Sequence, residues 1–191
     1  MKYINNEYYH VYNRGANKAR IFFLKDNYRH CFSLMGKYSA KHAVSILAYC
    51  LMPNHYHLVC RGDHDGSISK FLRDTFNAYT QAVNKQQRLS GTLFQGRARA
   101  KHITSDSYVV QVVRYIHLNP VEAGIVATPE EWKFSDYLNW IGKPCEDLKP
   151  SQGSLLRSGY FKNGDSYRNF VDTSYSAGKD QAEMKLYLYD E

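Results

Sequence analysis

Two histidines separated by a single residue, His55 and His57, are the first candidates for chemistry in this 191-residue chain. Alternate side chains of a β-strand share a face, so the two imidazoles would lie about 6–7 Å apart along the backbone. Two neutral imidazoles at that spacing can bind one metal ion and leave positions for a third ligand and a substrate oxygen. The alternative is a pair of partly exposed strand histidines with no ligand, which is the commoner case for an isolated His-x-His.

Tyr115 and Asn119 form a second candidate pair, four residues apart in a segment with helical periodicity. Residues at this spacing lie one above the other on the same helical face. Tyrosine can act as a covalent nucleophile, but with an ordinary pKa near ~10 it needs activation or a strongly polarised electrophile. Asn119 offers a neutral oxygen as a third metal ligand. The alternative for Tyr115 is a core aromatic, one of 17 tyrosines in the chain.

Charge is unevenly distributed along the chain, whose formal net charge is +7. Residues 1–121 carry a net +11 and residues 122–191 a net −4. No acidic residue occurs between positions 75 and 105, where five cations stand: Lys85, Arg88, Arg97, Arg99 and Lys101. An acid-free basic stretch favours a polyanionic partner, and the many tyrosines could stack on unpaired bases, so we expect nucleic acid. A merely soluble basic surface is the alternative.

The cysteines do not form a recognisable metal-binding pattern. Cys31, Cys50, Cys60 and Cys145 contain no C-x-x-C pair, so we expect buried thiols and no disulfide framework. Zinc bound by these cysteines and the two histidines is a minor alternative, because Cys60 should face away from His55 and His57. No apolar run is long enough for a membrane span and no secretory signal is visible, so we expect a cytoplasmic protein without membrane association.

The segments that must position these residues alternate between strand and helix. Strands are predicted at residues 8–15, 43–51, 55–60 and 93–103, and helices at residues 25–41, 67–88 and 106–119, with Ser67 as a helix cap and Pro120 as a helix end. The order βαββαβ predicts an α+β, ferredoxin-like fold: an antiparallel sheet with helices on one face, followed by an added C-terminal helix that carries Tyr115. Residues 1–142 would form one domain, and residues 143–191 an extended, irregular tail with weak helical pieces.

Four segments resemble those of single-tyrosine transposases with a His-hydrophobic-His (HUH) motif. They are Met52 to Val59, Arg114 to Val121, His10 to Gly15, and Phe94 to Arg97. Their order is most similar to that of REP-associated tyrosine transposases, over about residues 8 to 140, and Tyr167-x-x-Phe170-Val171 resembles the tail of that group more weakly. One departure is Tyr56 between the histidines, where the family has an aliphatic residue; it should point away from the metal.

The resemblance implies a mechanism. Mg²⁺ or Mn²⁺ would be held by His55, His57 and Asn119, and Tyr115 would cleave single-stranded DNA at REP-type hairpins through a 5′-phosphotyrosine intermediate that a 3′-hydroxyl can reverse. Such a protein would act on the nucleoid as a monomer or homodimer. For the DNA backbone we expect first Arg97, Arg99 and Lys101, which strand alternation places on one side, and second Arg14, Lys85 and Arg88.

Three other functions remain open from the sequence. The first is a non-catalytic protein that binds REP hairpins. The second is a metal-dependent nuclease that uses activated water and leaves no protein-linked product. The third is a small ferredoxin-like RNA-binding module, in which His55 and His57 would hardly matter.

Overall fold

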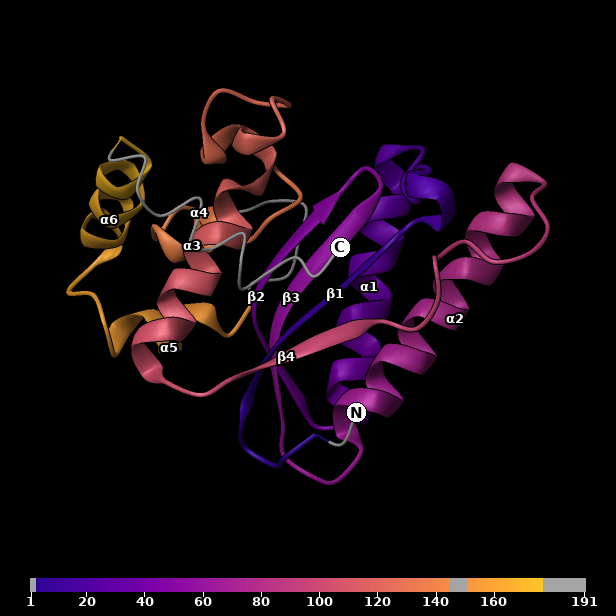
Figure 1. Ribbon diagram of the computed structural model, residues 1–191, viewed down its shortest axis with the longest axis horizontal. Coiled ribbons are helices and arrows are strands. Elements are labelled where there is room, and N and C mark those ends of the chain that lie inside the picture. The colour runs from indigo at the N-terminus through magenta and orange to yellow at the C-terminus, as the bar shows by residue number, and fades with distance from the viewer. Residues whose placement is uncertain (1–2, 145–150, 177–191) are drawn as a thin grey trace.

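The computed structural model describes residues 3–144 and 151–176. Its four strands are β1 (Tyr8–Arg14), β2 (Val44–Met52), β3 (His55–Gly62) and β4 (Arg99–Ile103). Its helices are α1 (Lys25–Lys41), α2 (Ser67–Gln87), α3 (Asp106–Glu122), α4 (Tyr137–Trp140), α5 (Gly153–Ser158) and α6 (Gly164–Ser176), with short 3-10 turns at Ala16–Lys18 and Pro129–Glu131. Figure 1 shows the sheet between two groups of helices, α1 with α2 on one side and α3 to α6 on the other.

The strands form one antiparallel sheet in the order β2-β3-β1-β4. Strand β3, which holds the motif histidines, and strand β1 are therefore neighbours at the centre of the sheet. Met52 pairs with His55, so Pro53 and Asn54 alone connect β2 to β3. This arrangement confirms the predicted ferredoxin-like α+β fold.

Strand alternation divides the sheet into two faces with different roles. Val11, Leu58 and Cys60 point to the face covered by α1 and α2, where they join the larger hydrophobic cluster. Tyr56 points the same way and stacks on Phe76 of α2, with ring centroids 4.1 Å apart. The opposite face, called the site face below, carries His10 and Tyr12 of β1 and His55 and His57 of β3. Alternation thus sends Tyr56 and Cys60 away from the histidines, as the sequence predicts.

A second hydrophobic cluster packs α3, α4 and α6 against the site face. Tyr167 and Val171 of α6 are fully buried in it, beside Trp140 of α4. The described residues after position 150 therefore differ from the expected extended tail, because α5 and α6 contribute to a core. The periodicity in this short segment is too weak to reveal a partner surface made by α3 and α4.

A buried polar network joins α3 to the C-terminal helices. Asp136 is 2% exposed and its carboxylate accepts hydrogen bonds from His117 Nε2 (2.9 Å) and Trp140 Nε1 (3.1 Å), and from the Ser151 hydroxyl. His117 Nδ1 lies 2.7 Å from the Tyr167 hydroxyl. Burial raises the pKa of Tyr167 well above its ordinary value, so the phenol keeps its proton and can donate it to this nitrogen. The network provides hydrogen-bond partners for the buried side chains of Asp136, His117 and Tyr167.

The predicted strand at residues 93–103 is wrong in its first half. Regular pairing begins at Arg99, while Phe94 makes only an isolated bridge to Gly15 and Gly96 adopts a φ of +152°. The backbone here follows the end of β1, since Gln95 N donates to Arg14 O at 2.9 Å. Arg97 therefore precedes the strand. Arg99 and Lys101 lie opposite Tyr12 and His10 and share the site face with them, as alternation predicts.

One predicted helix end and one predicted helix cap are also wrong, although the second helix starts at residue 67 as predicted. Pro120 lies inside α3, which continues to Glu122. Proline removes one backbone donor, and in the last turn of a helix that loss is small; Ala123 N still donates to Asn119 O at 3.0 Å. At the start of α2 the cap position is Gly66, with a φ of +74°, and Ser67 is the first helical residue.

Three of the four cysteines lie in the described residues, and all three are buried free thiols. Burial raises the pKa of Cys60 to about 12, which keeps it an inert thiol at neutral pH. Cys145 lies outside the described residues. None of the described helices is long and apolar enough to cross a membrane.

Candidate active site

The two motif histidines lie side by side at the start of β3, on the site face. Their ring centroids are 5.0 Å apart and the ring planes are nearly perpendicular, at 87°. His57 is 2% exposed, whereas His55 is partly exposed beside the turn of Pro53 and Asn54.

Helix α3 brings Tyr115 and Asn119 to the same two rings. The Tyr115 ring meets the His57 ring edge-on, with centroids 5.6 Å apart. Asn119 Oδ1 lies 2.9 Å from His55 Nε2. Tyr115 and Asn119, four residues apart on one helical face, thus contact His57 and His55, two residues apart on one strand face. The four predicted residues meet although about 60 positions separate the two pairs in the chain.

His10 is a fifth member of this group that the sequence did not single out. It is 1% exposed, its Nε2 lies 2.9 Å from His57 Nδ1, and the two rings stack with centroids 5.1 Å apart. The ring of Tyr115 also meets His10 edge-on, at 6.4 Å. The sequence could have revealed His10 in two steps. The βαββαβ topology makes β1 the neighbour of β3. His10 lies two residues before Tyr12 on β1, so both side chains point to the face that carries the motif histidines.

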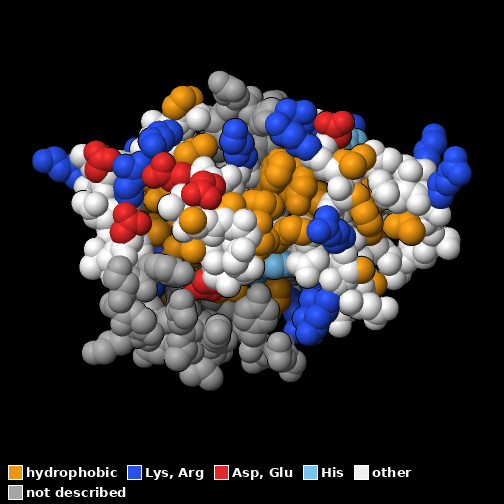
Figure 2. All heavy atoms as spheres, turned by 90° about the horizontal axis from the view of Figure 1, so that it is seen from above, with side chains coloured by type: hydrophobic (Ala, Val, Ile, Leu, Met, Phe, Trp, Pro, Cys, Tyr) orange, Lys and Arg blue, Asp and Glu red, His pale blue; other side chains and the backbone are white. Residues whose placement is uncertain are grey.

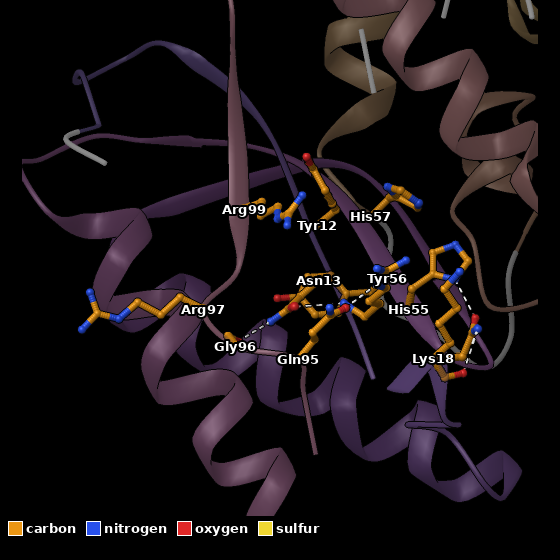
Figure 3. Close-up of a pocket in the computed structure, with 12 residues that line it drawn as sticks. Tyr12, Asn13, Lys18, His55, Tyr56, His57, Gln95, Gly96, Arg97 and Arg99 are labelled. Atoms are coloured by element: carbon orange, nitrogen blue, oxygen red, sulfur yellow. Dashed lines mark hydrogen bonds between the residues drawn. The ribbon is translucent and has the colours of Figure 1, made fainter. Parts of the chain in front are cut away.

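A pocket of about 320 Å³ opens in front of these histidines (Figure 3). It is built from the end of β1, the start of β3 and the segment before β4, and it is lined by Tyr12, Asn13, Arg14, Lys18, Asn54, His55, Tyr56, His57, Gln95, Gly96, Arg97 and Arg99. Asn13 Nδ2 donates to Gly96 O at 3.0 Å, and Arg14 Nε donates to Gln95 Oε1. These bonds hold the segment before β4 against β1 and so shape the pocket wall.

The pocket wall does not include Tyr115 or Asn119. Tyr115 is 4% exposed and Asn119 7% exposed, behind the histidines on the buried side of α3. The structure therefore places the phenol next to the imidazoles but covers it.

Comparison with known proteins decides the family. Residues 3–119 match the family described as "Transposase IS200 like". The chain belongs to the IS200-like transposase family. The match extends from β1 to Asn119, so it includes both histidines and the tyrosine of the group described above.

One solved structure shares the fold of this chain. A REP-associated tyrosine transposase bound to a REP hairpin superposes with a TM-score of 0.65 at 19% identity, covering 79% of this chain and 90% of that one. A Deinococcus radiodurans protein described as a transposase gives a TM-score of 0.38 at 16% identity, covering 60% of this chain and 91% of that one. No curated protein sequence matches the chain.

The histidines of this IS200-like transposase are neutral because they are buried. Burial lowers the pKa of His57 well below its ordinary value, and the neighbouring His55 and His10 add to the effect. Burial lowers the pKa of His10 to about 3, with Lys101 as a smaller cause. The pKa of His55 is also lowered by burial, against an opposing hydrogen bond to Asn119. Neutral imidazole is the form that binds metal.

The donor set can hold a divalent cation. His57 Nε2 is buried and has no hydrogen-bond partner among the described residues, which leaves a lone pair or proton unsatisfied. His55 Nε2 and Asn119 Oδ1 lie 2.9 Å apart, with the nitrogen donating to the amide oxygen, and both would become further ligands once a cation replaces that proton. Within the described residues no group of three or more His, Cys, Asp or Glu side chains is placed to bind a metal, and the amide oxygen of Asn119 would be the third protein ligand beside the two histidines. The two imidazole nitrogens would also suit other divalent metals. Mg²⁺ or Mn²⁺ is expected from the resemblance to single-tyrosine transposases.

The predicted DNA-contacting cations fall into two places. Arg14, Arg97 and Arg99 line the pocket, although Figure 3 shows the Arg97 side chain directed away from the histidines. Lys101 lies on the site face opposite His10. Lys85 and Arg88 stand at the C-terminal end of α2 and are not pocket residues. Lys18, a pocket residue, was missed because nothing in the sequence ties it to the strand ends.

The surface around this end of the molecule is basic with an apolar centre. Seen from above in Figure 2, Lys and Arg side chains surround an exposed hydrophobic area and a histidine, whereas most of the visible acidic side chains gather over the side of α3 to α6. Cations around an apolar centre suit a polyanion that crosses the site.

Proposed function

We propose that this protein cleaves and rejoins single-stranded DNA through a 5′-phosphotyrosine intermediate formed on Tyr115. One observation carries the proposal: α3 places the Tyr115 ring 5.6 Å from the His57 ring and Asn119 Oδ1 2.9 Å from His55 Nε2, so that nucleophile and metal donors form one cluster. Membership in a transposase family makes DNA the polymer on which such a cluster acts.

His55, His57 and Asn119 would hold Mg²⁺ or Mn²⁺, which when bound supplies Lewis-acid polarisation of the scissile phosphodiester. Tyr115 Oη attacks the phosphorus, a tyrosine O–P bond forms, and the bond from phosphorus to the 3′ oxygen breaks. The phenol loses its proton in this step, and the departing 3′ oxygen takes up a proton to become the free 3′-hydroxyl. The reverse attack by a 3′-hydroxyl rejoins strands without ATP, because the phosphotyrosine bond keeps the energy of the cleaved linkage.

Burial of Tyr115 has a consequence for this reaction. Tyr115 is 4% exposed as a residue and does not line the pocket, so we infer that its hydroxyl meets a phosphate only after local movement of α3 or of the pocket wall. DNA binding in the pocket, next to His55 and His57, would supply the interactions that favour such a movement.

The substrate class we propose is a REP-type hairpin with adjoining single-stranded nucleotides. The structural relative was solved with a REP hairpin bound, and the present chain places Arg14, Arg99 and Tyr12 at one pocket. Guanidinium groups bind phosphates and an aromatic ring can stack on an unpaired base, which suits single-stranded DNA.

The test is a search for the covalent product. Labelled single-stranded REP DNA incubated with the protein and Mn²⁺ should give a protein-linked band that survives denaturation. Tyr115→Phe should abolish the band and all cleavage while leaving DNA binding within about twofold, because only the attacking oxygen is removed. Tyr108→Phe is the matched control, since Tyr108 lies two turns earlier on α3, and it should cleave normally.

The other outcomes identify the alternatives. Binding without any cleavage by the wild-type protein would indicate a non-catalytic hairpin-binding protein. Cleavage that Tyr115→Phe leaves intact, with no protein-linked band, would indicate a nuclease that uses water. Preference for RNA, unaffected by His57→Ala, would indicate an RNA-binding module.

A further inference from the structure

The contact between His10 and His57 is the shortest link between β1 and the proposed metal donors. The register pairs His57 with Tyr12 and His10 with Val59, so the two imidazoles meet diagonally across the central strand pair. Their facing nitrogens, His10 Nε2 and His57 Nδ1, are 2.9 Å apart. Both side chains are at most 2% exposed, so water does not compete for this bond.

The bond can carry only one proton. Each buried neutral imidazole has one N–H and one lone pair, so one nitrogen donates and the other accepts. The two outer nitrogens, His57 Nε2 and His10 Nδ1, have no hydrogen-bond partner among the described residues. The direction of the shared bond therefore decides the tautomer of His57, because nothing else in the described structure does.

Only one direction makes His57 a ligand. If His57 Nδ1 donates to His10, Nε2 presents a lone pair to a cation; if His10 donates, Nε2 carries a proton and cannot coordinate. Metal-ligating histidines generally donate their second N–H to a partner, which fixes the ring and raises its basicity. In this chain the partner is another imidazole.

We propose that His10 is a positioning residue that accepts the Nδ1 proton of His57 and holds its Nε2 lone pair ready for a divalent cation. This inference rests on the proposed metal-dependent function. It extends the site to β1, the first strand of the fold, and it explains why a histidine is buried on the site face beneath Tyr12, whose ring stacks on it at 5.1 Å.

The first test reads the tautomer directly and needs no metal or DNA. In ¹⁵N-histidine-labelled protein, a protonated ring nitrogen and one with a free lone pair have different ¹⁵N chemical shifts. The His57 signals are identified by their loss in His57→Gln. We expect His57 protonated on Nδ1 in the metal-free wild type. Protonation on Nε2 would overturn the inference.

The second test measures Mn²⁺ binding alone. His10→Phe keeps the ring volume but removes the acceptor, so we expect Mn²⁺ to bind about 10–100-fold more weakly. In His10→Gln the amide oxygen can take the place of Nε2 and should restore most of the affinity. His102→Phe is the matched control, because His102 lies on β4 and stacks on Tyr9 at 5.0 Å on the opposite face, away from the donors.

The outcomes separate this inference from the proposed function. Wild-type affinity in His10→Phe, in protein that still forms the covalent DNA product, would overturn the role of His10 alone. Failure of the wild type to form that product, with the expected tautomer and the expected loss of Mn²⁺ binding in His10→Phe, would overturn the cleavage proposal and support the role of His10.

Discussion

At the scale of single residues, the site face buries two imidazoles, His10 and His57, against each other, with the partly exposed ring of His55 beside them. His10 and His57 each lie against aromatic rings, and neither has a carboxylate among its hydrogen-bond partners in the described residues. Their neutrality is useful for metal binding, but it makes folding sensitive to acid.

We predict that stability falls as the pH drops below about 6.5. The unfolded chain protonates His10 with an ordinary pKa of 6.5, whereas the folded protein protonates it only at a pKa of about 3. Between these values the unfolded state binds the extra proton, so acid favours unfolding, and above about 6.5 the effect vanishes. For His10 alone the free energy of unfolding should fall by about 1.4 kcal/mol between about pH 7.5 and about pH 5.5.

Urea unfolding at the two pH values measures this effect. His10→Phe should show a smaller loss than the wild type, because it lacks the titrating ring. An equal loss in both proteins would show that His10 does not cause the acid sensitivity.

At the scale of elements, α3 is held on two sides near its C-terminal end. Asn119 contacts β3 through His55, and His117 contacts α6 through Tyr167 and the α4 region through Asp136. The helix that carries the proposed nucleophile is therefore held between the sheet and the C-terminal helices.

We predict that Tyr167→Phe destabilises this element. The change keeps the ring but removes the hydroxyl that lies 2.7 Å from His117 Nδ1, leaving a buried nitrogen without its partner. The expected loss is about 1–3 kcal/mol in the free energy of unfolding. Tyr38→Phe on α1 is the control and should stay within about 0.5 kcal/mol of the wild type; similar values for the two variants would contradict the structural role of this bond.

Local sequence signals sufficed for some elements and failed for others. Alternation along β3 and β4 correctly placed His55, His57, Arg99 and Lys101, because the strand period is a property of the chain itself. The break before β4 and the partners of α6 depend on surfaces contributed by distant segments. To predict His10 as a site residue requires the pairing of β1 with β3. That pairing follows only when the strand order is combined with the alternation of side chains along β1.

At the scale of the whole molecule, charge is uneven along the chain, with a net +11 over residues 1–121 and a net −4 over residues 122–191, and most of the acidic side chains visible in Figure 2 lie over the side of α3 to α6. Three of the six predicted DNA-contacting cations line the pocket, and two stand at the far end of α2. This division allows a comparison of two basic sites within one protein.

We predict that Arg97→Ala with Arg99→Ala weakens binding to all single-stranded sequences and flattens its salt dependence. If each guanidinium neutralises one phosphate, the slope of log K against log salt should become shallower by about 1.4. Titration of labelled DNA at several salt concentrations measures it. The double variant Lys85→Ala with Arg88→Ala should change the slope less. A larger change in this variant than in Arg97→Ala with Arg99→Ala would indicate that DNA binds at the end of α2 instead.

The buried carboxylate of Asp136 has a consequence for how far this protein can be shortened. The family match stops at residue 119, and a fragment ending there would lack Asp136 itself; a fragment ending at Gly142 would keep Asp136 but lose Ser151 and Tyr167, two of the groups that complete the network around this acid and His117. Such a fragment would expose the underside of the helix that carries the proposed nucleophile to water. Minimal versions of the protein should therefore retain the chain through α6.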